Sequence, residues 1–499
     1  MAGYSNPVIP GFHPDPSVCR VGDEYFLAVS SFTYFPGVPI FRSSNLVDWT
    51  QLGNALDRPS QLDLSGTELT ASLGIFAPTL RHHDGRFWMI TTVYRAPGGP
   101  DSFFVTADDP AGPWSEPTSL AIPGIDPDIA WDDEGNCWVS FSSGPRGVFR
   151  CRIDTETGEV LDGPEPTWSG TGLQYPEAPH LFERDGLWYL LIAEGGTERG
   201  HAVSIARGPS PTGPWEGCPA NPILSHRSTD RPIQNTGHAD LVEATDGSWW
   251  MVLLATRPRG GSPMFHVLGR ETFLTPVEWV DGWPVVEPVE RSVGRRPPGP
   301  AAAKSVAGRE DFDGPTLDPR WLAVRRPPQE LARLDRRPGH LTVLGDEATL
   351  DDPRPAFVGR RQQHERCRAS TAVEAGDSDE AGIAVRMDER AHYEVAVIVD
   401  RVVAQARIGP LTSEVAAAPS PGPSVVLFVE TKDGGFSAPD RVVLGYQDSS
   451  GADQVLARLD GRYLSTEVAG GMLGRVIGLY AVGGEAHFDW FEYHEVESP

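Results

Sequence analysis

The stretch Ala77-Pro-Thr-Leu-Arg-His-His-Asp-Gly-Arg-Phe-Trp-Met-Ile90 decides the fold class of this chain. It contains two mostly apolar runs with Asp84-Gly85 in the turn between them. Asp-Gly in this position is a strong β-hairpin signal, because a two-residue turn needs a positive φ at its central positions. We therefore predict two antiparallel strands here.

The same pattern occurs five times along the first half of the chain. Each copy has a small or acidic residue, often followed by proline, then a strand, a turn and an aromatic-rich strand. The copies start at Asp15, Ala77, Asp126, Ala178 and His238, with 49 to 62 residues between successive starts. This spacing is typical of a β-propeller blade of four antiparallel strands. Five copies predict five blades, whose innermost strands bring equivalent positions together around one central channel.

The composition favours an all-β protein with more than one domain. Of the 499 residues, 54 are glycine and 47 are proline, and both favour turns over helix interiors. We expect a propeller over 1–292, a proline-rich linker over 293–309 and a second domain over 310–499. Alternation in segments such as Tyr393-Glu-Val-Ala-Val-Ile-Val predicts antiparallel strands that form a β-sandwich in the second domain.

Charge and cysteine content disfavour several classes of function. A net charge of −27 repels nucleic acid and anionic membranes. The sequence has no apolar stretch of about 18 residues and no secretory signal, so we expect a cytoplasmic protein. The five cysteines are widely spaced and form no C-x-x-C pair, which favours buried thiols over disulfides or a zinc site.

Three carboxylates, Asp15, Asp126 and Glu177, lie at or beside equivalent inner-strand positions of three repeats. Each alone could cap a turn. Carboxylates that converge repel one another, which raises the pKa of at least one of them. Residues with shifted pKa values cluster at functional sites. An acid and a base on opposite sides of a bond are what glycoside hydrolysis requires. The pattern therefore favours Glu177 as general acid, Asp15 as the base that orients water, and Asp126 as the carboxylate that holds the acid.

Eight ordered motifs in this chain resemble glycoside hydrolase family 43, most closely its two-domain β-xylosidases and α-L-arabinofuranosidases. The tail Leu464-Ser-Thr-Glu-Val-Ala-Gly-Gly is also similar to the C-terminal sandwich of that family. The motifs are Gly11-Phe-His-Pro-Asp15-Pro-Ser, Phe32-Thr-Tyr-Phe-Pro-Gly-Val-Pro, Gly74-Ile-Phe-Ala-Pro, Gly124-Ile-Asp126-Pro, Glu177-Ala-Pro-His, Ala193-Glu-Gly-Gly-Thr197, Gly237-His238-Ala and Leu268-Gly-Arg270-Glu-Thr.

The resemblance implies a five-bladed propeller followed by a concanavalin-like β-sandwich, and hydrolysis with inversion at the anomeric carbon. It implies that Asp15 is the general base, Glu177 the general acid, and Asp126 the pKa modulator that also orients the acid. It further implies a set of substrate-binding residues, comprising Arg270, His238 at the pocket floor, the aromatic wall residues Phe32 and Phe76, and Thr197. No cofactor is required, although calcium near His238 is a candidate because some relatives carry it.

The chain departs from the family pattern at three positions, all in the specificity shell. Phe76 stands where many relatives have Trp, Ile125 where some have Phe, and Met472 where the sandwich loop that reaches the pocket often has Phe. A methionine keeps such a wall apolar but makes it more flexible. These differences affect the preferred sugar and leave the acid and base in place.

We expect an exo-acting β-1,4-xylosidase that removes terminal pentose from short xylo-oligosaccharides. An α-L-arabinofuranosidase, or one enzyme with both activities on arabinose-substituted oligosaccharides, remains an alternative. A retaining fructosidase would carry an Arg-Asp-Pro segment where this chain has Ile125-Asp126-Pro127. A non-catalytic carbohydrate-binding propeller would not need three inner-strand carboxylates. The sandwich and linker leave room for a homo-oligomer.

Overall fold

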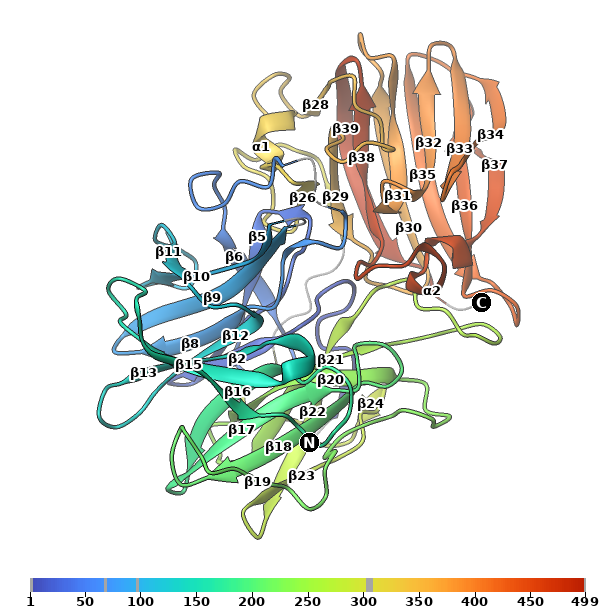
Figure 1. Ribbon diagram of the computed structural model, residues 1–499. Coiled ribbons are helices and arrows are strands. Elements are labelled where there is room, and N and C mark those ends of the chain that lie inside the picture. Colours follow the sequence, from blue (N-terminus) through green and yellow to red (C-terminus); the bar gives the residue numbers. More distant parts are fainter. Residues whose placement is uncertain (1–2, 67–69, 96–97, 302–307, 498–499) are drawn as a thin grey trace.

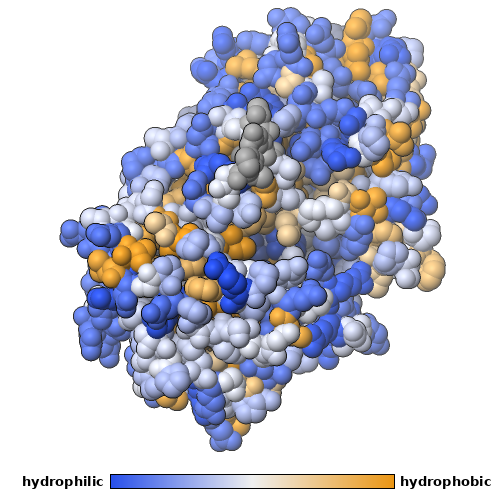
Figure 2. Space-filling view, in the orientation of Figure 1, coloured by the Kyte–Doolittle hydropathy of each residue, from blue (hydrophilic) through white to orange (hydrophobic). Residues whose placement is uncertain are grey.

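The computed structural model describes residues 3–66, 70–95, 98–301 and 308–497. Five small antiparallel sheets surround a common axis, and two larger sheets form a second domain beside them (Figure 1). This arrangement confirms the predicted all-β fold of a five-bladed propeller followed by a β-sandwich. Hydrophilic residues cover most of the face seen in Figure 2. No helix within the described ranges is long and apolar enough to cross a membrane.

Each blade contains one of the five repeats, whose first strand lies innermost. Blade 1 comprises β2 (Ser17–Val21), β3 (Glu24–Ala28), β5 (Gly37–Ser43) and β6 (Thr50–Leu56), and blade 2 comprises β7 (Gly74–Ile75), β8 (Thr79–His83), β9 (Arg86–Arg95), β10 (Gly99–Ala107) and β11 (Thr118–Leu120). Blade 3 comprises β12 (Ile125–Trp131), β13 (Cys137–Ser142), β14 (Val148–Ile153) and β15 (Val160–Trp168), with a 3-10 turn at Gly144–Arg146. Blade 4 comprises β16 (Glu177–Arg184), β17 (Leu187–Glu194), β18 (Ala202–Gly208) and β19 (Glu216–Gly217), and blade 5 comprises β20 (Gln234–Glu243), β21 (Trp249–Thr256), β22 (Glu271–Val280) and β23 (Trp283–Val286).

The Asp-Gly turns of blades 2 and 4 have the backbone conformation that the sequence predicts, whereas in Asp246-Gly247 of blade 5 only the glycine has a positive φ, of 80°. Asp84 and Gly85 have φ values of 49° and 74°, and Asp185 and Gly186 have values of 53° and 75°. Positive φ at both central positions matches the twist of the two flanking strands. These two turns therefore explain why the repeats of blades 2 and 4 fold locally as hairpins.

The first residues of the chain close the propeller by packing on its last blade. Strand β1 (Tyr4–Ser5) pairs with β24 (Ser292–Val293), which follows blade 5. The side chain of Asn6 donates to the carbonyls of Leu274 and Glu290, each at 2.9 Å, and accepts from the Leu274 N–H at 3.0 Å. These bonds join the two ends of the ring.

One guanidinium, that of Arg81 on β8, links the innermost strands of all five blades. Its Nη1 donates to Ser17 of blade 1 at 3.1 Å and to Asp240 of blade 5 at 2.8 Å. Its Nη2 donates to Asp128 of blade 3 at 2.8 Å and lies 3.0 Å from Nδ1 of His180 in blade 4. Both carboxylates are buried, so Arg81 supplies the positive charge that makes their burial tolerable.

The second domain consists of two packed antiparallel sheets. One contains, in spatial order, β27 (Ala332–Arg333), β28 (Leu341–Gly345), β39 (Gly484–Glu495), β30 (Cys367–Glu374), β35 (Ser424–Asp433), β36 (Asp440–Gln447) and β37 (Asp453–Asp460), with β25 (Arg309–Glu310) also paired to β39. The other contains β34 (Leu411–Pro419), β33 (Arg401–Ile408), β32 (Ala391–Ile398), β31 (Glu380–Asp388), β38 (Val476–Val482), β29 (Phe357–Arg361), β26 (Leu322–Val324) and β4 (Tyr34–Phe35). Three short helical turns complete it: α1 (Pro328–Leu331), a 3-10 turn at Gly461–Leu464 and α2 (Thr466–Ala469).

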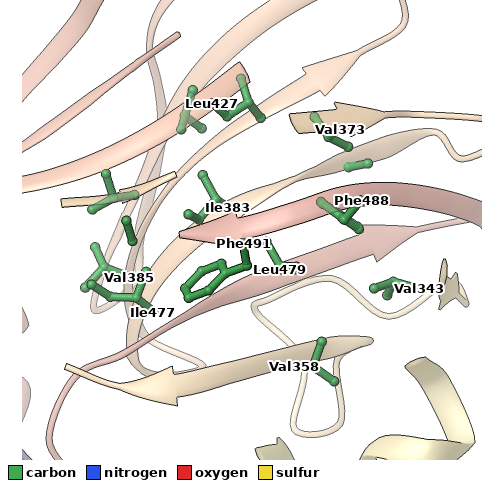
Figure 3. Packing of buried hydrophobic residues seen from close by; sticks show 14 of the residues in the cluster. Val343, Val358, Val373, Ile383, Val385, Leu427, Ile477, Leu479, Phe488 and Phe491 are labelled. Carbon is green, nitrogen blue, oxygen red and sulfur yellow. The ribbon is translucent and has the colours of Figure 1, made fainter. Parts of the chain in front are cut away.

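The core between these two sheets is formed by residues that alternate along each strand. Val373 and Phe491 of one sheet face Ile383 and Leu479 of the other, and all four are fully buried (Figure 3). Burying one such side chain stabilises the fold by about 1.5–3 kcal/mol. The alternation predicted from the sequence therefore produces the packed interior of the sandwich.

Strand β4 comes from the propeller half of the chain but belongs to a sheet of the sandwich, which the sequence did not predict. Tyr34 pairs with Val324, and Phe35 pairs with Ala323. Beside this strand, Phe12 of the propeller shares one buried cluster with Leu473 of the sandwich. The two domains are thus joined by backbone pairing as well as by apolar packing.

The predicted linker over 293–309 includes residues 302–307, which lie outside the described residues. Val293 is paired in β24 before residues 302–307, and Arg309 is paired in β25 after them. Between these points, Asn45 of blade 1 donates to the Pro300 carbonyl at 2.6 Å, and Arg296 forms an ion pair with Asp48. The described part of the connection therefore packs along blade 1.

Replacing Arg81 by Met should destabilise the propeller, because Asp128 and Asp240 would lose their cationic partner while staying buried. The expected loss in free energy of unfolding is about 3–5 kcal/mol, measured by urea denaturation. The matched control is Arg86→Met on the next strand, which breaks only an exposed ion pair with Asp108 and should cost less than about 1 kcal/mol. Equal losses in the two variants would contradict the role of Arg81.

Candidate active site

Backbone irregularities aim the predicted site residues into the channel. The inner strands of blades 3, 4 and 5 change register at the site, between Ile125 and Asp128, between Glu177 and His180, and between Gln234 and Ala239. Such bulges redirect side chains and are frequent beside active sites. Several site residues also have a left-handed backbone conformation: φ is 57° at Asp15, 52° at Asp126, 51° at Ala178 and 44° at His238.

Asp15 lies almost fully buried at the start of blade 1, surrounded by donors. Nη1 of Arg270 donates to its Oδ1 at 3.1 Å, and the Ser30 hydroxyl donates to its Oδ2. Burial by itself raises the pKa of a carboxylate, but the Arg270 charge and the Ser30 hydrogen bond hold the pKa of Asp15 below its ordinary value. Asp15 is therefore ionised at neutral pH, as a general base must be.

Asp126 is also buried, but its pKa shifts in the opposite direction. Burial raises its pKa well above the ordinary value, and the charges of Glu177 and Asp15 raise it further. A hydrogen bond from the backbone of Ala178 and the charge of Arg270 only partly oppose the rise. The three carboxylates thus converge as predicted, and the repulsion among them raises the pKa of Asp126.

Glu177 is the most accessible of the three carboxylates, with 20% of its side chain exposed. Its Oε1 lies 3.6 Å from Nε2 of the buried His201. The Nδ1 atom of His201 faces the Asn235 carbonyl at 3.2 Å. A carbonyl can only accept, so Nδ1 of His201 carries a proton and the Nε2 side of the ring faces Glu177. The buried His201 ring therefore borders Glu177 on one side.

His238 lies buried beside Asp15, with its Nδ1 3.4 Å from Asp15 Oδ1. Burial lowers the pKa of His238 to about 3, although the Asp15 carboxylate acts in the opposite direction. The ring is therefore neutral at working pH.

Calcium near His238, considered from the sequence, stays a prediction. Calcium takes six to eight oxygen ligands, which can be carboxylates, backbone carbonyls or waters, and the charged groups that act most strongly on His238 include one carboxylate, Asp15. That carboxylate already accepts hydrogen bonds from Arg270 and Ser30. Within the described part of the chain, no group of three or more His, Cys, Asp or Glu residues is arranged to hold a metal.

Arg270 connects Asp15 to the Gly-Gly-Thr segment of blade 4. Besides Asp15, its Nη1 contacts the Thr197 hydroxyl at 3.1 Å. Its Nε and Nη2 are buried without a hydrogen-bond partner in the described structure. Unpaired buried donors are costly, and hydroxyl groups of a bound sugar can satisfy them. The predicted pairing of Arg270 and Thr197 at one site is therefore present.

An aromatic wall extends from Arg270. The Arg270 guanidinium lies 5.5 Å above the centre of the Phe32 ring, and Phe32 lies 5.2 Å from Phe76. Phe76 in turn stacks on Tyr94, with 5.5 Å between the ring centres and 15° between the planes. The two predicted wall residues are therefore adjacent, and Tyr94 supports them from blade 2.

The remaining predicted residues approach the site from two sides. Ile125 is half-buried and directly precedes Asp126 on β12. Met472 lies in a sandwich loop whose backbone N–H donates to the Ser72 hydroxyl of the propeller at 2.9 Å. The next residue, Leu473, packs in the same cluster as Phe32. The sandwich therefore reaches the propeller surface beside the aromatic wall.

Sequence reasoning missed Ser30 and His201, which contact the predicted base and acid. Both follow the second strand of a predicted hairpin: Ser30 lies two residues after the end of β3, and His201 lies in the loop after β17. The strand ends of a propeller hairpin meet at one rim, so polar residues just after these strands were a usable signal. All five cysteines are buried and free, as the sequence predicted.

Comparison with known proteins agrees with this fold. The model of the glycosyl hydrolases family 43 matches residues 4–284, and that of the beta xylosidase C-terminal concanavalin A-like domain matches residues 309–494. The chain belongs to glycoside hydrolase family 43.

Two curated relatives match over nearly the whole chain. A "Xylosidase/arabinosidase" of Butyrivibrio fibrisolvens is 38% identical, with 96% of each chain covered. A "Non-reducing end alpha-L-arabinofuranosidase" of Bacteroides ovatus is 37% identical over 98% of this chain and 94% of that protein.

Solved structures agree equally well. The "Xyloglucan PUL GH43B" of Bacteroides ovatus has a TM-score of 0.91 at 35% identity, covering 99% of this chain and all of that one. A "xylan beta-1,4-xylosidase" from Bacillus halodurans C-125 has a TM-score of 0.90 at 30% identity, with the same coverage.

The raised pKa of Asp126 predicts a pH-dependent cost in stability. Because the folded-state pKa exceeds the unfolded value, this cost is absent below the unfolded pKa of about 3.9 and grows as the pH rises through the folded pKa. Asp126→Asn removes the charge, so its Tm relative to the wild type should increase between pH 4 and pH 8. Thermal unfolding across this range measures the difference. The exposed turn variant Asp23→Asn is the control, and a pH-independent difference for Asp126→Asn would contradict the assignment.

Proposed function

We propose that this enzyme is an exo-acting, inverting β-1,4-xylosidase with Asp15 as general base, Glu177 as general acid and Asp126 as modulator. The convergence of the three carboxylates in one pocket carries the proposal: Arg270 contacts Asp15, and the charges of Glu177 and Asp15 both act on Asp126. Carboxylates that share a pocket but have different environments can take distinct roles in the reaction. The chemistry uses carboxylates alone and needs no cofactor.

The base step follows from the contacts of Asp15. The Arg270 charge keeps Asp15 ionised, so it can take a proton from a water molecule as that water attacks the anomeric carbon. Ser30 and Arg270 fix both carboxylate oxygens and therefore the direction of the attack. Because water is the nucleophile, no covalent intermediate forms and the anomeric configuration inverts.

The acid step belongs to Glu177, which gives its proton to the glycosidic oxygen as the bond to the leaving sugar breaks. The backbone of Ala178, the residue after Glu177, donates a hydrogen bond to Asp126 and so ties the start of the acid's strand to Asp126. The buried ring of His201, whose Nε2 lies 3.6 Å from Oε1 of Glu177, borders the acid on one side. Asp126 and His201 thus position the acid without touching the reacting bond.

Substrate binding combines the unpaired Arg270 donors with the aromatic wall. The donors suit hydroxyl groups of the terminal sugar, and Phe32 and Phe76 suit its apolar faces. The sandwich loop at Met472 bounds the site on one side. A site bounded in this way favours release of one terminal pentose at a time from short xylo-oligosaccharides.

An α-L-arabinofuranosidase, alone or combined with xylosidase activity, is the second candidate. Relatives with names for both activities match nearly the whole chain at 37–38% identity. Ile125 and Met472 are the positions at which we expect the two sugars to be distinguished, since both differ from the family pattern.

Comparing an aryl β-D-xyloside with an aryl α-L-arabinofuranoside tests the function directly. We expect the larger kcat/KM on the xyloside, and NMR should show α-xylose as the first product from the β-xyloside. Preference for the arabinofuranoside would establish the second candidate, and β-xylose as first product would overturn inversion.

Replacing Glu177 by Gln should lower kcat on xylobiose by about 10²–10⁴-fold, because the leaving sugar loses its proton donor. The loss should be far smaller on a dinitrophenyl xyloside, whose leaving group needs little protonation. Asp15→Asn should instead lower kcat on both substrates by about 10²–10⁴-fold, since water activation serves each. Steady-state kinetics distinguishes the two patterns.

The matched control for the acid is Glu183→Gln, an exposed carboxylate on the same strand. Its kcat should stay within about twofold of the wild type, as expected for a surface substitution. Unchanged activity of Glu177→Gln on xylobiose would refute the acid assignment.

A further inference from the structure

Tyr175 is exposed beside the acid in a conformation that needs an explanation. It is one of the large apolar or aromatic residues on the surface, with 51% of its area exposed. Its φ is 50°, a left-handed value that is unusual for a bulky side chain and that concentrates at functional sites. Tyr175 shares this conformation with Asp15, Asp126 and His238.

The backbone on both sides of Tyr175 is fixed. The carbonyl of Gln174 accepts from the Gly195 N–H at 2.6 Å, and the carbonyl of Pro176 accepts from the Ser142 hydroxyl at 2.8 Å. Blades 3 and 4 therefore hold the chain on either side of the residue. The exposed ring is presented from a supported backbone, so little ordering is needed when a ligand covers it.

The ring of Tyr175 lies close to the Gly-Gly-Thr segment of blade 4. Gly196 has a φ of 81°, and a Cβ built there would lie 3.7 Å from Cδ2 of Tyr175. Tyr175 thus packs against the Gly-Gly-Thr segment, whose Thr197 contacts Arg270. This chain of contacts places the ring at the rim of the pocket.

We propose that Tyr175 is the stacking platform for the sugar on the leaving-group side of the scissile bond. The inference rests on the proposed function of Glu177 as general acid. The acid protonates the oxygen that joins the leaving sugar, so that sugar must lie beside Glu177, two residues from Tyr175. A half-exposed aromatic ring with a polar hydroxyl suits a pyranose, which offers an apolar face and a hydroxyl rim. Tyr175 therefore contributes to the choice of leaving group, while Arg270 and the aromatic wall bind the sugar that is released.

The test compares a substrate that fills the leaving-group subsite with one that leaves it empty. Xylobiose fills it, whereas β-D-xylosyl fluoride is cleaved to xylose and fluoride, with water forming the new C1–O bond as C1–F breaks. Tyr175→Ala should lower kcat/KM on xylobiose about tenfold, mainly through KM, and change it less than twofold on the fluoride. Tyr175→Phe should keep the wild-type values on both substrates, because the stacking ring remains.

Phe436→Ala is the control, since Phe436 is 91% exposed and lies on the sandwich. It should leave both substrates unaffected. Equal losses of Tyr175→Ala on xylobiose and the fluoride, or no loss on xylobiose, would overturn the platform, with a Tm measurement identifying any variant that misfolds. Failure of the wild-type enzyme to cleave either substrate would instead overturn the proposed xylosidase function.

Discussion

The ion-pair network of Arg81 on the propeller axis is the interaction on which the rest of the structure depends. Five innermost strands meet there, and each brings polar groups that cannot reach bulk water. One guanidinium contacts partners from the other four blades. Asp128 and Asp240 lie two residues beyond Asp126 and His238 on their strands, and Ser17 lies two beyond Asp15. The network therefore fixes the strands just below the layer that carries the site.

In the layer that carries the site, the pKa of each aspartate depends on how it lies relative to the Arg270 guanidinium. Arg270 contacts Asp15 directly and keeps it ionised, while Asp126 faces two other carboxylates and is pushed toward its neutral form. The same residue type thus has opposite pKa shifts in one pocket. The net charge of −27 has little bearing on this difference, because surface charges are screened over about 10 Å by salt.

The sandwich contributes to the site as well as to stability. Strand β4 of the propeller half extends one of its sheets, and the loop at Met472 contacts Ser72 on the propeller. Phe32 of the propeller and Leu473 of the sandwich belong to one buried apolar cluster. A shift of either domain would therefore change the packing at the aromatic wall. The two domains therefore meet beside the aromatic wall, whereas the three converging carboxylates come from the propeller alone.

The sequence by itself determined the local structure and the chemistry-bearing residues. Asp84-Gly85 forces a hairpin because its turn needs positive φ, and the recurrence of this pattern is sufficient for five blades. The resemblance then singled out Asp15, Asp126 and Glu177. Only the tertiary structure decided how strands far apart in sequence meet: the bulges that aim the carboxylates, the Arg81 network, and the approach of His201 to Glu177. These contacts depend on register and on the ring closure of the propeller, which no local sequence pattern encodes.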